Sequence, residues 1–167
     1  MMKQNKMNKW FIPEGLAKED EFGQLLVNKE GGNYTKASKE DDMYNHIDLY
    51  WTLDDKTYSF DVKSMKKHNR KDELPDDSIH WIELQNVQGR PGWLYGKMNY
   101  IAFETNNNWL IIEPKRILKL INEKVKSKEI VKTKELYTYY QRWGRNDIVV
   151  KVLTKDLIDI ANKIIDK

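Results

Sequence analysis

The sequence predicts a single α/β domain in which helices flank a central sheet. Apolar residues recur at helical spacing near both ends of the chain, and short runs typical of strands lie between them. With 167 residues the chain can bury one substantial core and is short for two ordinary domains. We therefore expect one domain over residues 1–167, with residues 1–12 flexible.

The first predicted element is an amphipathic helix over residues 16–29. Its apolar residues have helical spacing, and its first turn is acidic, which the positive end of the helix dipole favours. Two glycines, Gly31 and Gly32, end it. Residues 33–45 are polar and predict a connector, in which Lys36 either contacts a substrate backbone or is simply solvated.

Two short runs, residues 46–51 and 57–64, flank a turn and predict a β-hairpin. Because side chains alternate along a strand, one face of the hairpin is apolar and the other carries Asp48, Asp61 and Lys63. Neighbouring strands lie about 4.8 Å apart, so the two carboxylates are expected to approach each other. This face predicts either a site for a hard cation such as Mg²⁺ or Mn²⁺, or only the solvated side of the hairpin.

The remaining elements follow the same patterns. We expect strands at residues 78–87, 100–104, 109–113 and 148–153, a helix at residues 115–125, and a last helix from Thr154 through Ile165. The strand at residues 78–87 should lie beside residues 57–64, with Glu83 and Gln85 on one face. Residues 126–147 fit no single element; their aromatic and basic cluster is either a nucleic-acid contact, an oligomer surface or core.

Two loops carry basic and aromatic side chains that could bind nucleic acid. The first follows Lys63 and contains Lys66, Lys67 and Arg70, whereas the second, residues 89–100, contains Arg90 and Trp93. Such groups can bind phosphates and stack on bases, but a solvated charge run or a packed aromatic loop explains them equally well.

Composition excludes several other classes of site. The chain has no Cys, which removes disulfides, zinc–thiolate sites and thiol nucleophiles, and its three His lack the spacing of a zinc site. A net charge of +3 means that any nucleic-acid surface must be local. No run approaches the ~20 apolar residues of a membrane span, and the start lacks a signal peptide. We expect a cytoplasmic protein, in the host cytoplasm if it is phage-encoded.

Asp48, followed after a turn by Asp61-Val62-Lys63 on the next strand, resembles the motif of the PD-(D/E)XK nuclease superfamily, with Ile47 in place of the proline. The resemblance implies a restriction-endonuclease-like αβββαβ core with a mixed sheet. It also implies Mg²⁺-dependent cleavage of DNA, with Asp48, Asp61 and the Val62 carbonyl as metal ligands and Lys63 acting on the attacking water.

The resemblance extends to further residues. In many members a Glu of the first helix turns toward the metal, and Glu21 matches this placement best, with Glu19 as the alternative. Glu83 is a further metal ligand and Gln85 an accessory residue by the same comparison. Residues 81–104 are also similar to segments of small phage and bacterial nucleases. By analogy we expect a homodimer that resolves DNA junctions.

Two other functions remain possible from the sequence. The first is a binding module that keeps the nuclease-like fold and holds nucleic acid or a protein without cutting. The second is a glycosidase-like carboxylate pair, which is disfavoured because Lys63 would depress the raised pKa that its acid needs.

Overall fold

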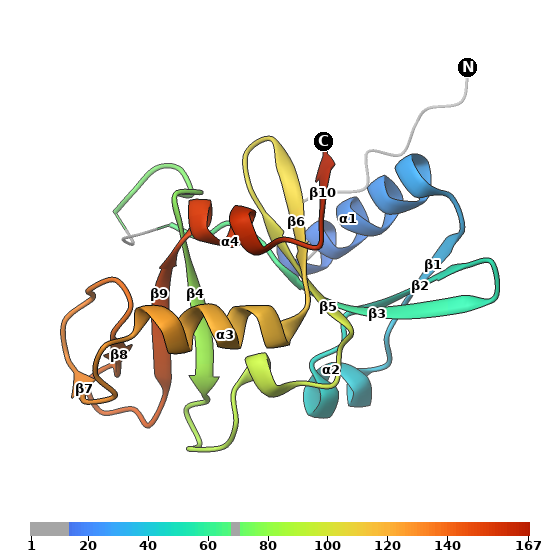
Figure 1. Cartoon of the computed structure of the whole chain (residues 1–167). Coiled ribbons are helices and arrows are strands. Elements are labelled where there is room, and N and C mark those ends of the chain that lie inside the picture. Colours follow the sequence, from blue (N-terminus) through green and yellow to red (C-terminus); the bar gives the residue numbers. More distant parts are fainter. Residues whose placement is uncertain (1–13, 68–70) are drawn as a thin grey trace.

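Two β-sheets form the framework of the computed structural model, which describes residues 14–67 and 71–167 (Figure 1). The larger sheet has the order β1 (Asn33–Lys36), β2 (Leu49–Leu53), β3 (Lys56–Lys63), β5 (Tyr100–Glu104), β6 (Asn108–Ile112), β10 (Lys163–Asp166). The smaller sheet has the order β4 (Ile79–Gln85), β9 (Ile148–Leu153), β8 (Tyr139–Tyr140), β7 (Ile130–Val131). The helices are α1 (Glu14–Glu30), α2 (Lys39–Asn45), the 3-10 turn η2 (Trp93–Tyr95), α3 (Pro114–Lys124) and α4 (Thr154–Ile160). The predicted α/β class is confirmed.

The larger sheet is mixed. Strands β1, β2 and β3 form an antiparallel meander, and β3 then pairs in parallel with β5, so that Lys63 lies opposite Phe103. Parallel neighbours need a crossover connection, and here β4 lies within that crossover as part of the smaller sheet. In the same way β9 lies in the chain between β6 and β10. The chain therefore alternates between the two sheets.

The predicted hairpin is confirmed as β2 and β3. Its two turn residues, Asp54 and Asp55, have φ angles of 49° and 65°. Two successive left-handed residues are typical of the two-residue turn whose twist matches that of the flanking strands. The turn fixes the register, with Leu49 opposite Phe60.

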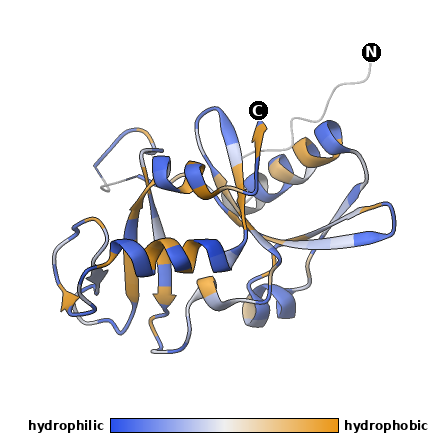
Figure 2. Ribbon diagram, viewed as in Figure 1, coloured by the Kyte–Doolittle hydropathy of each residue, from blue (hydrophilic) through white to orange (hydrophobic). Residues whose placement is uncertain are grey.

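The core consists of two clusters on opposite faces of the larger sheet. One packs α1 against the sheet through Phe22, Phe60 and Trp109, all at most 2% exposed. The other fills the space between the two sheets and α3, and includes Ile82 and Phe103. Figure 2 shows hydrophobic residues along the central strands, and hydrophobic and hydrophilic residues alternating along α3. Strand β3 therefore contributes its alternate side chains to two different environments.

Three sequence expectations differ from the structure. Residues 33–45, predicted as a connector, contain β1 and α2, which Ser38 caps by accepting from the backbone N–H of Asp41. Residues 79–85 form the predicted strand but pair with β9, and not with β3. The last helix ends at Ile160, because Ile164 and Ile165 belong to β10, which pairs with β6. In each case the type or the end of the element is set by strand pairing with a distant segment or by a helix cap, and neither produces a periodic pattern in the sequence.

Two further expectations concern the ends and the membrane. Residues 1–12, expected to be flexible, lie outside the described residues. Among the helices that the structure describes, none is both long and apolar enough to cross a membrane.

The junction between α1 and β1 depends on Gly32, which has a φ of +75° and lies against β2. A Cβ added there would lie 2.2 Å from the carbonyl oxygen of Thr52. We expect Gly32→Ala to lower the free energy of unfolding by about 2–5 kcal/mol, combining left-handed strain with overpacking. Gly89, with a φ of +79° and nothing within 4 Å of an added Cβ, is the matched control. Gly89→Ala should cost only about 1–2 kcal/mol in urea denaturation, and equal losses for both variants would contradict the packing at Gly32.

Candidate active site

The centre of the candidate site is β3, which lies between β2 and β5. Asp61 and Lys63 lie two residues apart and share one face of this strand. Asp48 immediately precedes β2, and its backbone N–H donates to the carbonyl oxygen of Phe60 at 2.8 Å. Its Oδ2 accepts from the backbone N–H of Val62 at 2.7 Å. The fold thus brings together the three side chains of the predicted motif.

Asp61 is almost completely buried, with 2% of its surface exposed. Its Oδ1 lies 3.0 Å from the Lys63 ammonium, which is also 4.6 Å from the centre of the Trp93 ring. Its Oδ2 has no hydrogen-bond partner among the described residues. A buried carboxylate oxygen without a partner is costly, and either a proton shared with the neighbouring Asp48 carboxyl or a bound cation would satisfy it.

The helix carboxylate of the site is Glu19, the alternative to Glu21. The side chain of Glu19 is 16% exposed and lies close enough to Asp48 for the two carboxyl groups to interact. The side chain of Glu21 is 46% exposed and pairs with Lys18 at 3.2 Å, away from this contact. The sequence favoured Glu21, and helical spacing does not separate the two, because Glu19 has that spacing from Phe22 and Glu21 has it from Leu25.

An ion pair fastens this part of α1 to the sheet. Lys18, which precedes Glu19, places its ammonium 2.6 Å from Oε2 of the buried Glu104 at the end of β5. The other oxygen of Glu104 accepts from the backbone N–H of Met65, just beyond β3, at 3.1 Å. One carboxylate thereby holds the helix, β5 and the end of β3 in a fixed relation, and so holds Glu19 near Asp48.

Three carboxyl groups in contact change one another's acidity. Burial, and then the nearby Asp48, raise the pKa of Glu19 to about 7. Burial, and then Asp61, raise the pKa of Asp48 to about 8. Burial also raises the pKa of Asp61, although Lys63 opposes this effect. The described residues supply too little positive charge to keep all three groups ionised at neutral pH.

The donor set suits a divalent cation in its chemistry. Glu19, Asp48 and Asp61 offer only oxygen atoms, which hard cations prefer, and Oδ2 of Asp61 lacks a partner. The side chains do not stand in the arrangement of a closed metal centre: within residues 14–67 and 71–167, no three His, Asp or Glu side chains are grouped to hold an ion.

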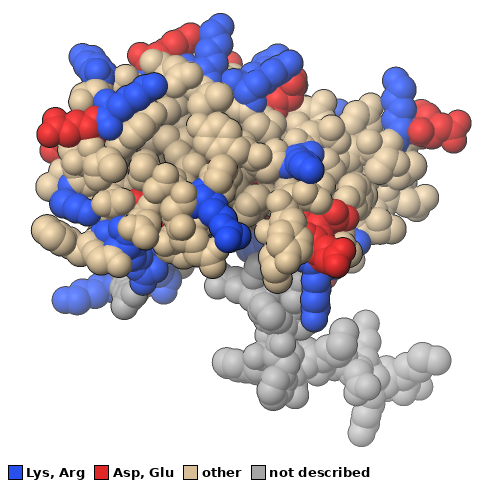
Figure 3. All heavy atoms as spheres, turned by 90° about the horizontal axis from the view of Figure 1, so that it is seen from below, with Lys and Arg blue, Asp and Glu red and all other residues tan. Residues whose placement is uncertain are grey.

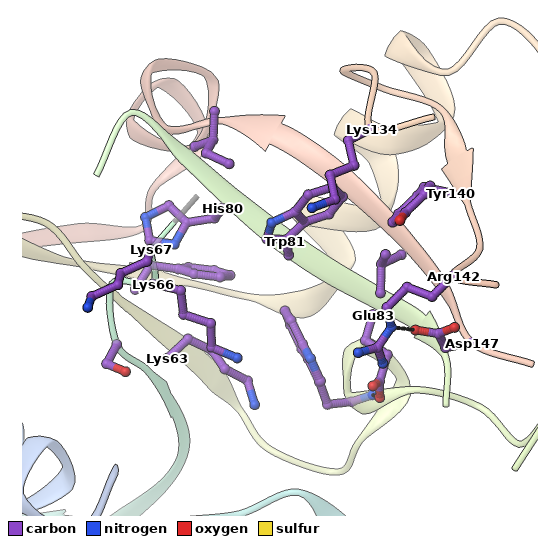
Figure 4. Close-up of a pocket in the computed structure, with 15 residues that line it drawn as sticks. Lys63, Lys66, Lys67, His80, Trp81, Glu83, Lys134, Tyr140, Arg142 and Asp147 are labelled. Carbon is purple, nitrogen blue, oxygen red and sulfur yellow. Dashed lines mark hydrogen bonds and ion pairs between the residues drawn. The ribbon is translucent and has the colours of Figure 1, made fainter. Parts of the chain in front are cut away.

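The two polar residues predicted on β4 lie elsewhere. Oε1 of Glu83 accepts from the backbone N–H of Trp93 at 3.2 Å, and Glu83 lies across a cavity from Lys63 (Figure 4). Gln85 donates through Nε2 to the carbonyl oxygen of Asn146 at 2.6 Å. Both follow from the position of β4 in the smaller sheet, and neither is placed with Asp48 and Asp61.

A cavity of about 290 Å³ opens beside Lys63, between β3 and the smaller sheet (Figure 4). Three side chains predicted to bind nucleic acid line it, namely Lys66, Lys67 and Trp93. Sequence reasoning did not connect this site with four other lining residues, Trp81, Lys134, Tyr140 and Arg142. Trp81 lies two residues before Glu83 on the same face of β4, whereas the other three come from a segment whose position only the fold reveals.

The other predicted nucleic-acid contacts are not in this cavity. Lys36 lies 3.2 Å from Asp20 and 3.8 Å from Glu19, so it contributes to the carboxylate side of the site. Arg90 is exposed on the turn after β4, and Arg70 lies outside the described residues. Positive and negative side chains are interspersed over the face in Figure 3, which agrees with the small net charge. The basic character that matters is therefore local to the cavity.

Neither a family model, nor a curated protein, nor a solved structure matches the chain. Its function has to be inferred from the chemistry of two adjoining features. The first is the cluster of three carboxyl groups formed by Glu19, Asp48 and Asp61, with Lys63 beside it. The second is the basic and aromatic cavity that begins at Lys63.

The raised pKa values predict that the metal-free protein loses stability as pH rises. Glu19 and Asp48 have pKa values of about 7 and about 8, against ordinary values of 4.5 and 3.8. Between these limits the folded state binds more protons than the unfolded state, so the free energy of unfolding falls with increasing pH. Asp48→Asn removes one titrating group and relieves Glu19, and should flatten this dependence in urea denaturation with a chelator present.

Glu21→Gln is the matched control, because it removes a carboxylate from the same helix without touching Asp48. This variant should retain the pH dependence of the unchanged protein. A free energy of unfolding that stays constant between about pH 5 and about pH 8 in the unchanged protein would contradict the carboxylate contacts.

Proposed function

We propose that the chain is a metal-dependent endonuclease that hydrolyses DNA phosphodiester bonds. The observation that carries this proposal is the convergence of Asp48, Asp61 and Lys63 from two paired strands, with Glu19 of α1 against Asp48. Placing these carboxyl groups close together away from water costs free energy, which a bound cation would offset. The adjoining cavity supplies basic side chains for a phosphate backbone.

The order of the elements supports a restriction-endonuclease-like core. Helix α1 precedes an antiparallel meander of β1, β2 and β3, and β5 then joins β3 in parallel to make a mixed sheet. The chain departs from the αβββαβ order in two places. Helix α2 lies between β1 and β2, and the connection from β3 to β5 contains β4 and η2 where that order has a helix.

Each side chain has a distinct part in the proposed reaction. Glu19, Asp48 and Asp61 would hold Mg²⁺ or Mn²⁺, whose contribution when bound is to neutralise phosphate charge and lower the pKa of the attacking water. Lys63, freed from Asp61 by the cation, would place its ammonium against the scissile phosphate and stabilise the charge that develops there. The Lys63 ammonium lies 4.6 Å from the centre of the Trp93 ring, and the indole therefore restricts its movement.

A binding module without catalysis is the second candidate function. It is favoured by the ion pair between Lys63 and Asp61, which satisfies the lysine without any metal ion. It is also favoured by the distances between the acidic side chains, because no three of them in the described part of the chain are close enough together to hold a metal ion. Such a module would use the basic cavity alone.

A homodimer acting on branched DNA remains a further proposal. One chain carries one cluster of Glu19, Asp48 and Asp61, and so one candidate active site. Cutting two strands of a junction requires two active sites, which a symmetric dimer would supply. The expected partners are therefore DNA and a second copy of the chain.

The nuclease proposal predicts a specific pattern of activity loss. Asp61→Asn and Lys63→Ala should each reduce Mg²⁺-dependent cleavage by about a hundredfold or more, because each removes charge that acts on the transition state. Glu19→Gln should also reduce cleavage strongly, whereas Glu21→Gln should not. The substrates to compare are supercoiled plasmid, linear duplex, single strand, flap and four-way junction, with Mn²⁺ as an alternative ion. Cleavage that survives both Asp61→Asn and Lys63→Ala would refute the assignment.

Metal binding separates the two candidate functions. Calorimetric titration with Mg²⁺ or Mn²⁺ should give heat that disappears in Asp48→Asn and in Asp61→Asn but persists in Glu21→Gln. Binding should tighten with increasing pH, because the cation displaces protons from Glu19 and Asp48. DNA binding without any such heat would favour the module.

A further inference from the structure

We propose that the cavity beside Lys63 holds one unpaired nucleotide, and that the substrate class is DNA with a single-stranded or splayed segment. This inference rests on the proposed function and names the substrate of the same site. It is carried by the position, charge, aromatic lining and size of the cavity.

The position of the cavity links it to the candidate catalytic groups through one side chain. Lys63 lines the cavity, and its ammonium lies 3.0 Å from Oδ1 of Asp61. Trp93, whose ring centre is 4.6 Å from the same ammonium, forms part of the wall. A nucleotide in the cavity would therefore lie next to the phosphate on which Lys63 and Asp61 act.

The lining is positive on balance and favours an anion, because its five cationic side chains outnumber its two carboxylates; they are Lys63, Lys66, Lys67, Lys134 and Arg142 against Glu83 and Asp147. Lys66, Lys67 and Lys134 form no ion pair with any residue that the structure describes. Arg142 is held by the buried Asp147 at 2.7 Å and so has a fixed position. Desolvation, and then the nearby Lys63, lower the pKa of Lys66 although its side chain reaches solvent. A phosphate group bound among these side chains would reduce the repulsion between their positive charges.

The aromatic side chains of the lining suit a base. Trp81 lies against Tyr140 with ring centres 5.7 Å apart, and both side chains face the cavity together with Lys134 (Figure 4). Trp93 adds a second indole from η2. Aromatic rings stack on any base, because every base presents a flat π surface. Lysines beside indoles therefore match a nucleotide better than a simple inorganic anion.

The size of the cavity excludes a double helix. About 290 Å³ is close to the lower limit for small-molecule sites, which suits a group of the size of one nucleotide and is far too small for a duplex. A base inside a duplex cannot enter such a space without leaving its stack, whereas an already unpaired base enters without that cost. The substrate is therefore DNA in which at least one strand is unpaired near the cut.

Binding of DNA by the full chain carrying Asp61→Asn, with a chelator to prevent cleavage, tests this proposal. The probe is a fluorescent oligothymidylate of about ten nucleotides, compared by anisotropy with a duplex of equal length and with free thymidine monophosphate. The oligonucleotide should bind more tightly than both. Adding Trp81→Ala should weaken its binding by about tenfold to a hundredfold, whereas Trp143→Ala should leave it within about twofold. Trp143 is 80% exposed and lies outside the cavity lining.

A second pair of variants covers the case in which Trp81→Ala fails to fold. Lys134 is exposed and lines the cavity, whereas Lys132, two residues earlier, lies over the Trp143 ring. Lys134→Gln should weaken oligonucleotide binding and reduce its salt dependence, and Lys132→Gln should do neither. Duplex bound as tightly as single strand, or equal effects of the two lysine substitutions, would overturn the proposal. Thymidine monophosphate bound as tightly as the oligonucleotide would overturn DNA as the substrate class.

The same proteins distinguish failure of this inference from failure of the proposed function. If cleavage depends on Asp61 but oligonucleotide binding does not depend on Trp81 or Lys134, the nucleotide subsite is refuted while the nuclease assignment stands. If binding depends on Trp81 and Lys134 but no cleavage is seen, the subsite stands and the chain is a binding module.

Discussion

The burial of the Asp61 carboxylate on the central strand of the larger sheet is the constraint on which the rest of the site depends. A charge in such a position has to be compensated or neutralised. Lys63 compensates one oxygen at 3.0 Å, and the other oxygen has no partner among the described residues. Asp48 and Glu19 add negative charge nearby and so take up protons at pH values where exposed carboxyl groups would be ionised. At neutral pH the charge of these neighbouring carboxyl groups is therefore reduced by bound protons.

The two faces of β3 explain how one strand serves both stability and chemistry. Phe60 belongs to the cluster that packs α1 against the sheet, whereas Asp61 and Lys63 point to the side where the smaller sheet lies. The helix is therefore held by the same strand that carries the candidate catalytic groups, and Lys18 fixes it further through Glu104. Stability and the position of Glu19 thus depend on the same contacts.

Local patterns in the sequence predicted the centre of the site, and long-range pairing decided its periphery. Alternation along two strands was enough to place Asp48 near Asp61. Helical spacing did not separate Glu19 from Glu21, because Glu19 has that spacing from Phe22 and Glu21 from Leu25, and both apolar residues belong to the packing against the sheet. The sequence favoured Glu21, whereas the structure places Glu19 beside Asp48. Nothing local shows that β4 pairs with β9, and so the sequence placed Glu83 near the carboxylates instead of across a cavity. The same limit applied to Ile165, whose strand is defined by its partner β6.

The alternation of the chain between the two sheets has a consequence for how the molecule comes apart. Strand β4 belongs to one sheet yet lies in the chain between two paired strands of the other, and β9 repeats the arrangement before β10. A single cut in the backbone cannot release either layer as an independent piece. We expect melting to be a single cooperative event, in which the cavity beside Lys63 and the cluster of Glu19, Asp48 and Asp61 are lost together.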